Sequence, residues 1–64
     1  MEKIQISLAA ARVNAGMTQE QVAKEMNVSK NTVINWEKGI IKGPALHALC
    51  SLYNIPIDNI FLPD

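Results

Sequence analysis

The helix start between Met17 and Val22 is the feature that most constrains this chain. Thr18 is a favourable N-cap residue, and Gln21 three positions later can hydrogen-bond back to the Thr18 backbone, which makes a capping box. Met17 before the cap and Val22 at the fourth helical position supply the apolar pair of a hydrophobic staple. These two signals predict a helix that begins after Thr18, and its apolar stripe predicts an end near Met26.

A second helix start follows within a few residues. Ser29 is a favourable N-cap residue, and Val28 and Val33 repeat the staple pattern. Asn27, between the two helices, belongs to the few residue types that tolerate a left-handed backbone. The pattern predicts two short helices joined by a sharp turn, a helix-turn-helix over about residues 18–38.

Caps and stops also divide the rest of the chain. Ser7 can cap a first helix and Gly16 can end it, Pro44 suits the first turn of a fourth helix, and Asp58 can cap a last one that runs through Phe61. No strand-like alternation persists. The predicted helices cover about residues 8–15, 19–26, 30–38, 44–53 and 58–61. We therefore expect residues 1–64 to form one all-α domain, a compact five-helix orthogonal bundle without strands.

Composition limits what such a domain can do. Sixty-four residues with 48% hydrophobic content can build a small core but rarely a deep catalytic pocket. The single cysteine, Cys50, excludes an internal disulfide and favours a cytoplasmic location, and we expect it to fill the core. His47 stands alone and is expected at the surface. No nucleophile, acid–base pair or metal-ligand cluster is evident, so we expect no catalytic residues, metal, cofactor or small-molecule ligand, and no membrane span.

The charge is unevenly distributed. Six basic and six acidic residues give a net charge of zero, which is unusual for a nucleic-acid binder. Residues 30–42 nevertheless hold three lysines against Glu37, a local balance of +2, whereas residues 43–64 carry only Asp58 and Asp64. One segment is therefore locally basic and the C-terminal segment is acidic.

Two segments of the helix-turn-helix carry a resemblance to a known family. Gly16-Met17-Thr18-Gln19-Glu20-Gln21-Val22-Ala23 and Asn27-Val28-Ser29-Lys30-Asn31-Thr32-Val33-Ile34-Asn35-Trp36-Glu37-Lys38-Gly39 are similar to G-[LM]-T-Q-E-x-[LV]-A and G-V-S-x-x-T-I-S-x-W-E-x-G. With Pro44 and the leucines that follow, the chain resembles the Cro and phage-repressor type of helix-turn-helix, also called the Xre family, over about residues 6–62. The resemblance implies a five-helix, lambda-repressor-like DNA-binding domain that acts as a sequence-specific transcriptional regulator, a phage- or mobile-element-type repressor.

The resemblance also assigns roles to individual residues. The helix over 30–38 would lie in the major groove of an operator duplex. The residues expected to contact bases are Gln19, Lys30, Asn31, Ile34 and Asn35. Those expected to contact the DNA backbone are Thr18, Thr32, Lys38 and Lys42. Arg12 and Glu37 would form a structural ion pair. Side-chain chemistry agrees, since asparagine can bind adenine bidentately and lysine can donate to guanine.

Three questions stay open on sequence alone. The same fold can serve as a protein-interaction module, antitoxin- or antirepressor-like, and the zero net charge and the outward position of Ile34 motivate that alternative. A homodimer is expected if two half-sites are read. The richest apolar stretch available for a dimer interface consists of Ile55, Ile57, Ile60, Phe61 and Leu62. Ile40 and Ile41 could either close the core edge or mark an interface.

Overall fold

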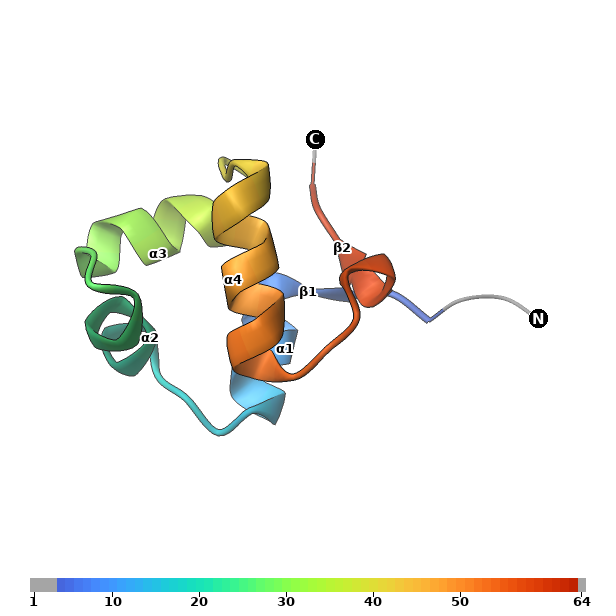
Figure 1. Cartoon of the computed structure of the whole chain (residues 1–64), viewed down its shortest axis with the longest axis horizontal. Helices are drawn as coiled ribbons and strands as arrows, with labels where there is room; N and C mark the ends of the chain where they lie inside the picture. Colours follow the sequence, from blue (N-terminus) through green and yellow to red (C-terminus); the bar gives the residue numbers. More distant parts are fainter. Residues whose placement is uncertain (1–3, 64) are drawn as a thin grey trace.

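The computed structural model describes residues 4–63, which form four α-helices, one 3₁₀ turn and two very short strands. In chain order these are β1 (Ile6–Ser7), α1 (Leu8–Asn14), α2 (Gln19–Met26), α3 (Lys30–Glu37), α4 (Gly43–Tyr53), η1 (Ile57–Asn59) and β2 (Ile60–Phe61) (Figure 1). Helices α2 and α3 pack against one another on one side of the molecule. The two strands lie on the opposite side of the molecule, away from the helix-turn-helix.

Side-chain caps fix where the first three helices begin. The Ser7 hydroxyl accepts a hydrogen bond from the Ala10 backbone at 3.0 Å. The Thr18 hydroxyl accepts from the Gln21 backbone at 3.1 Å, while the Gln21 side-chain oxygen accepts from the Thr18 backbone at 2.8 Å. Ser29 caps α3 in the same way. The predicted capping box and the N-caps Ser7, Thr18 and Ser29 are confirmed. The predicted cap Asp58 is wrong, because it lies inside the 3₁₀ turn, which Pro56 precedes.

Left-handed residues end the helices, and the sequence predicts two of them, Gly16 and Asn27. Gly16 follows α1 with φ of +73° and Gly39 follows α3 with φ of +98°. Asn27 and Asn54 take the same conformation after α2 and α4, with φ of 57° and 55°. A short polar side chain makes this conformation affordable for asparagine. The tight turn between α2 and α3 therefore forms without a glycine.

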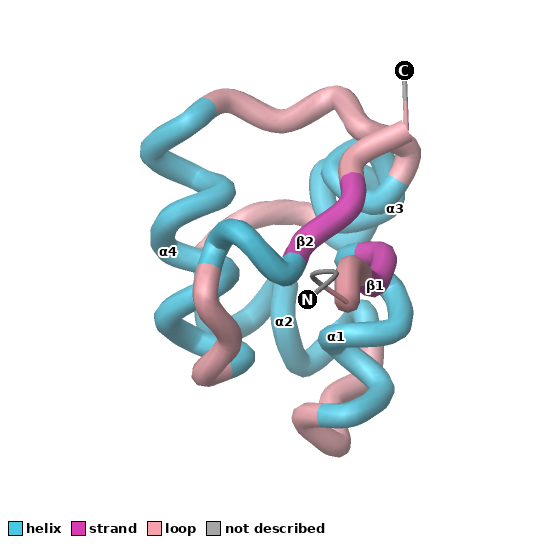
Figure 2. Tube along the Cα trace, turned by 90° about the vertical axis from the view of Figure 1, so that its right-hand side faces the viewer, coloured by secondary structure: helices cyan, strands magenta, loops and turns pink. Residues whose placement is uncertain are grey.

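The expected fifth helix and the expected absence of strands are wrong. Residues 57–59 make a single 3₁₀ turn, and Ile60 and Phe61 then extend as β2, which pairs in parallel with β1 (Figure 2). Ile6 lies opposite Ile60, and Ser7 lies opposite Phe61. Strands of two residues leave no alternating pattern, and their pairing joins opposite ends of the chain, so local signals could not reveal them.

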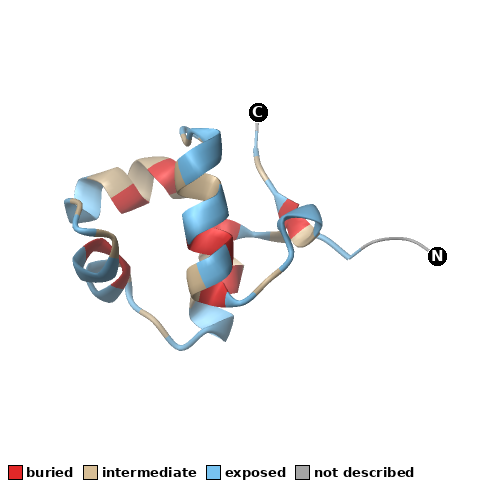
Figure 3. Ribbon diagram, viewed as in Figure 1, coloured by how far each residue is buried: buried red, intermediate tan, exposed pale blue. Residues whose placement is uncertain are grey.

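The core lies between the four α-helices and β2, which packs against α1. Its buried residues are Leu8, Ala11, Val22, Ala23, Val33, Trp36, Leu49, Cys50, Tyr53 and Ile60. Figure 3 shows the buried positions on the facing sides of the helices. Cys50 is a core residue, as predicted, and Trp36 is another. Ile41 packs against the core, whereas Ile40 is 69% exposed, so only Ile41 lies at the core edge.

Candidate nucleic-acid interface

Helix α3 packs through one face and leaves the opposite face open. Val33 and Trp36 are buried and anchor the helix to the core. Four sequence-predicted base-contacting residues follow one another on the other face. They are Lys30 and Asn31, which are exposed, and Ile34 and Asn35, which are half-buried. The core contacts therefore fix which side chains α3 offers to a partner.

The asparagines on this face are free to hydrogen-bond. Within residues 4–63 the side-chain amides of Asn31 and Asn35 have no hydrogen-bond partner, so each offers two donors and one acceptor to solvent. The Thr32 hydroxyl lies 2.9 Å from the Ser29 hydroxyl and helps to close the first turn of α3. Asn31 and Asn35 can thus recognise a base edge without first losing an internal contact.

The N-terminus of α2 adds backbone donors next to α3. The Thr18 hydroxyl already accepts a hydrogen bond from the backbone N–H of Gln21. The backbone N–H groups of Gln19 and Glu20 have no acceptor within the described part of the chain. Free N–H groups at the positive end of a helix favour an anion such as a phosphate.

Gln19 turns inward rather than toward solvent. Its Nε2 donates to Glu37 Oε1 at 2.8 Å, a contact that joins the start of α2 to the end of α3. The contact fixes the amide orientation, since only the nitrogen can donate to a carboxylate. Sequence reasoning placed Gln19 at a base edge and gave no sign of this bond, because residues 19 and 37 belong to different helices. One N–H and the amide oxygen remain for other contacts.

Arg12 and Glu37 come together as the resemblance implies. Arg12 Nε donates to Glu37 Oε2 at 2.8 Å, and the two side chains are 16% and 10% exposed. The Arg12 guanidinium also donates from Nη1 to the Met17 carbonyl at 2.9 Å. Glu37 therefore holds α1, the segment before α2, and Gln19 in one network with α3.

Tyr53 borders this network from α4. Its hydroxyl is buried and has no hydrogen-bond partner within residues 4–63. Burial raises the pKa of Tyr53 to about 12, chiefly because the phenolate loses hydration, and the negative charge of Glu37 adds to the rise while Arg12 opposes it. The hydroxyl is thus a neutral polar group enclosed in the core.

The cations of the candidate interface differ in their partners. Lys30 Nζ lies 3.5 Å from Glu20 Oε1, across the turn between the two helices. Lys38 and Lys42 are exposed and form no ion pair with any described residue. The sequence alone assigns no role to Glu20. Its contact with Lys30 joins α2 to α3, and no spacing within one helix predicts such a contact.

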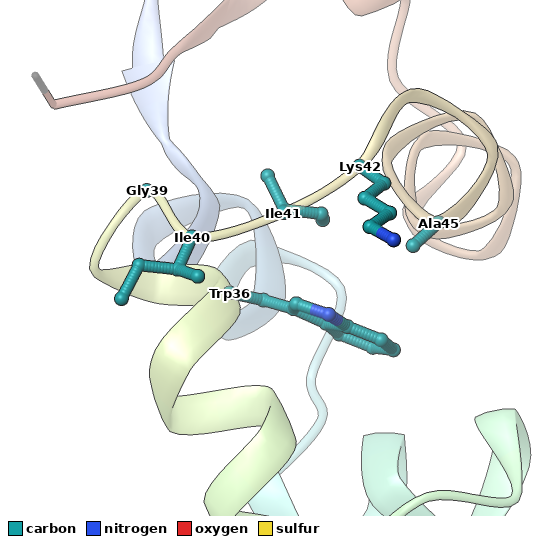
Figure 4. Close-up of a pocket in the computed structure, with 6 residues that line it drawn as sticks. All are labelled: Trp36, Gly39, Ile40, Ile41, Lys42 and Ala45. Carbon is teal, nitrogen blue, oxygen red and sulfur yellow. The ribbon is translucent and has the colours of Figure 1, made fainter.

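An open hollow of about 520 Å³ lies between the end of α3 and the start of α4. It is lined by Trp36, Gly39, Ile40, Ile41, Lys42 and Ala45 (Figure 4). The Lys42 side chain lies beside Ala45 (Figure 4). The lining of the hollow is mostly apolar, and Lys42 supplies the one charged side chain among its lining residues.

The remaining reactive groups are scattered. Cys50 is buried, and burial raises the pKa of its thiol, which keeps it protonated and unreactive. Within residues 4–63, no three histidine, cysteine or acidic side chains are close enough to share a metal ion. None of the helices in that range has the length and apolar character that crossing a bilayer needs.

Two short helices joined by a left-handed turn, the second with a polar face open to solvent, define the helix-turn-helix class of DNA-binding domain. The chain belongs to the helix-turn-helix family of the Cro/C1 type: the family model matches residues 8–60, which include all four α-helices. Members of this family are DNA-binding regulators and are typically not enzymes. No curated protein and no solved structure matches the chain.

Proposed function

We propose that this chain is a sequence-specific transcriptional regulator, a phage- or mobile-element-type repressor that occupies its operator with α3 in the major groove. The free amides of Asn31 and Asn35, on a helix held rigidly by Val33 and Trp36, carry the proposal. A helix with its side chains is about 10–12 Å across and the major groove is about 12 Å wide, so α3 can enter it.

The side chains of α3 divide the work of recognition. Asn31 and Asn35 read adenine edges through paired donor and acceptor bonds, and Lys30 donates to guanine. Ile34 contacts a thymine methyl group, which is the apolar feature of the major groove. Each good bidentate contact contributes about 1–3 kcal/mol of discrimination against the wrong base.

The DNA backbone is held by groups that flank α3. The N–H groups of Gln19 and Glu20 face one phosphate, with Thr18 beside them, and Thr32 lies at the start of α3. Lys38 and Lys42 contact phosphates beyond the other end of α3. The remaining N–H of the Gln19 amide, held by Glu37, is available to the backbone or to a neighbouring base.

Two substitutions test this division. The operator would first be found by selecting genomic DNA bound to the wild-type chain and sequencing it. Asn31→Ala should then relax the preference at one base position, by about 1–3 kcal/mol. Lys38→Ala should weaken binding to all sequences alike and lower the salt slope by about one. Identical behaviour of the two variants would contradict the assignment of base and phosphate contacts.

A homodimer follows from the size of the domain. One such domain buries only about 600–1,000 Å² on DNA, so useful specificity needs two copies on half-sites about 34–36 Å apart. The principal extents of the chain are 37 × 24 × 17 Å, which allows two copies at that spacing to touch. The second copy would bind the same face of the duplex.

Ile40 favours a second candidate function, a protein-interaction module of the antitoxin or antirepressor kind. Its side chain is 69% exposed beside the apolar hollow, and the chain carries no net charge that would attract DNA at a distance. Binding to genomic fragments at low salt decides between the two. A DNA reader binds with an affinity that falls steeply as salt rises, whereas an interaction module binds no fragment even at low salt.

A further inference from the structure

Glu20 places a negative charge on the surface that faces DNA in the proposed function. It lies in the first turn of α2, and its side chain is 78% exposed. Its carboxylate points to Lys30, the first residue of α3, with 3.5 Å between Oε1 and Nζ. The N-terminal end of α3 therefore presents a carboxylate and an ammonium side by side.

Two lysines, Lys24 and Lys30, are candidates for an ion pair with Glu20. Lys24 lies one helical turn after Glu20, in the orientation that favours an ion pair along a helix. Among the described residues, however, the only ion pair of Glu20 is the one with Lys30, across the turn. The carboxylate is thereby directed toward the end of α3 from which base edges are read.

The arrangement matches the edge of one base pair. In the major groove a G·C pair presents the guanine O6 acceptor next to the cytosine N4 donor, and the hydrogen bond that joins them is about 2.9 Å long. The Lys30–Glu20 pair presents a donor next to an acceptor at 3.5 Å. Lysine donates to guanine and glutamate accepts from cytosine N4, so the two edges are complementary.

We propose that Glu20 is a specificity-determining residue, and that Glu20 and Lys30 read one G·C base pair as a unit. This inference rests on the proposed DNA-binding function. Lys30 donates to guanine O6 and Glu20 accepts from the N4 amino group of the paired cytosine. A C·G or A·T pair at that position leaves both charges facing a group of the wrong kind. A T·A pair keeps the order of acceptor and donor, and Lys30 distinguishes it from G·C by donating also to guanine N7, where thymine carries its methyl group.

The pair also disfavours binding through phosphates alone. If Lys30 contacted a phosphate, Glu20 would lose its partner and face the anionic backbone. Glu20 therefore lowers the affinity for non-operator DNA more than the affinity for the operator. This selectivity suits a chain whose net charge is zero.

Glu20→Ala tests the proposal, with Glu25→Ala as the matched control. Glu25 is an exposed glutamate on the same helix and forms no ion pair within the described residues. For the wild type and both variants, bound DNA is selected and sequenced, and affinities are measured over a salt series. Circular dichroism and thermal unfolding check that the variants fold.

Both variants remove one negative charge, but only Glu20→Ala should change the base preference. Glu20→Ala should relax one G·C position by about 5- to 150-fold, the range for a good base contact, and should raise non-operator affinity. Glu25→Ala should leave every base preference unchanged. Combined with Lys30→Ala, Glu20→Ala should add little further loss at that position, because both side chains read the same base pair.

Three outcomes would count against the inference. Unchanged preferences for Glu20→Ala, or equal effects of the two glutamate variants, would show that Glu20 contributes only charge. Full additivity with Lys30→Ala would show that the two side chains read separate positions. In each case the wild type still binds its operator, so the proposed function stands. If the wild type binds no DNA at all, the proposed function fails, and this inference fails with it.

Discussion

Glu37 carries two structural contacts with one carboxylate. One oxygen accepts from Arg12 and the other from Gln19, so the orientation of α3 relative to α1 and α2 depends on a single side chain. Both members of the ion pair are largely buried. When one member of such a pair is removed, the other is left as an unpaired buried charge without water or a counterion. The resulting loss of folding stability is larger than the net stability that the intact pair contributes.

Removing one member of this pair should therefore destabilise the fold strongly. Glu37→Leu leaves the Arg12 guanidinium without its carboxylate, and we expect a loss of about 3–5 kcal/mol in the free energy of unfolding, measured with urea. The double variant Arg12→Met/Glu37→Leu should recover much of this loss, since no unpaired charge remains. A double variant as unstable as Glu37→Leu alone would contradict this explanation.

Tyr53 gives a prediction about pH. Its pKa rises from 10.0 to about 12 in the folded chain, so folding favours the protonated phenol. The associated stability is fully present below pH 10 and is lost as the pH rises toward 12, because only the unfolded chain then releases the proton freely. The loss should be visible as a falling free energy of unfolding between about pH 10 and 12.

Tyr53→Phe is the variant that isolates this effect. It removes a buried hydroxyl without a partner, so at pH 7 it should be as stable as the wild type or more stable, by up to about 1–3 kcal/mol. The difference in unfolding free energy between the two chains should then grow in favour of phenylalanine as the pH rises. A difference that stays constant across the range would mean that Tyr53 ionises equally in both states.

Helix boundaries were predictable because they depend on a few adjacent residues. Thr18 with Gln21, and Ser29, made local hydrogen bonds that the sequence predicts, and Asn27 took the expected left-handed turn. Contacts between elements were not predictable in the same way. The strand pair and the bonds from Gln19 to Glu37 and from Lys30 to Glu20 depend on how the helices pack.

The ends of α1 and α3 offer a matched comparison of this local control. Gly16→Ala should cost about 1–2 kcal/mol, because a side chain is strained at φ of +73° although nothing lies within 4 Å of the new Cβ. Gly39→Ala should cost more. It meets a similar strain at φ of +98°, and its Cβ would lie 2.5 Å from the Pro63 carbonyl oxygen.

Urea unfolding of the two glycine variants measures the difference. The excess for Gly39→Ala reports how firmly the segment after β2 is held against the end of α3. Equal losses would show that Pro63 yields without cost, and would separate the C-terminal segment from the stability of the helix-turn-helix.

The whole molecule separates two surfaces. Helices α2 and α3 hold the groups proposed to contact DNA on one side, and the β1–β2 pair lies on the other. A second copy can therefore contact the chain through the strands without covering α3. Of the apolar stretch after α4, Ile60 is buried and Ile55 and Leu62 are half-buried. Ile57 and Phe61 remain exposed, which narrows the expected dimer surface to two residues.

Phe61→Ser should therefore weaken dimerisation while leaving the fold intact, because 54% of this side chain is already exposed. Val13→Ser is the matched control, since Val13 is 63% exposed at the far end of α1. Sedimentation over a concentration series should show self-association for the wild type and Val13→Ser but a monomer for Phe61→Ser, with cooperative operator binding lost in parallel. A wild-type chain that stays monomeric at every attainable concentration and binds its operator one to one would exclude the dimer.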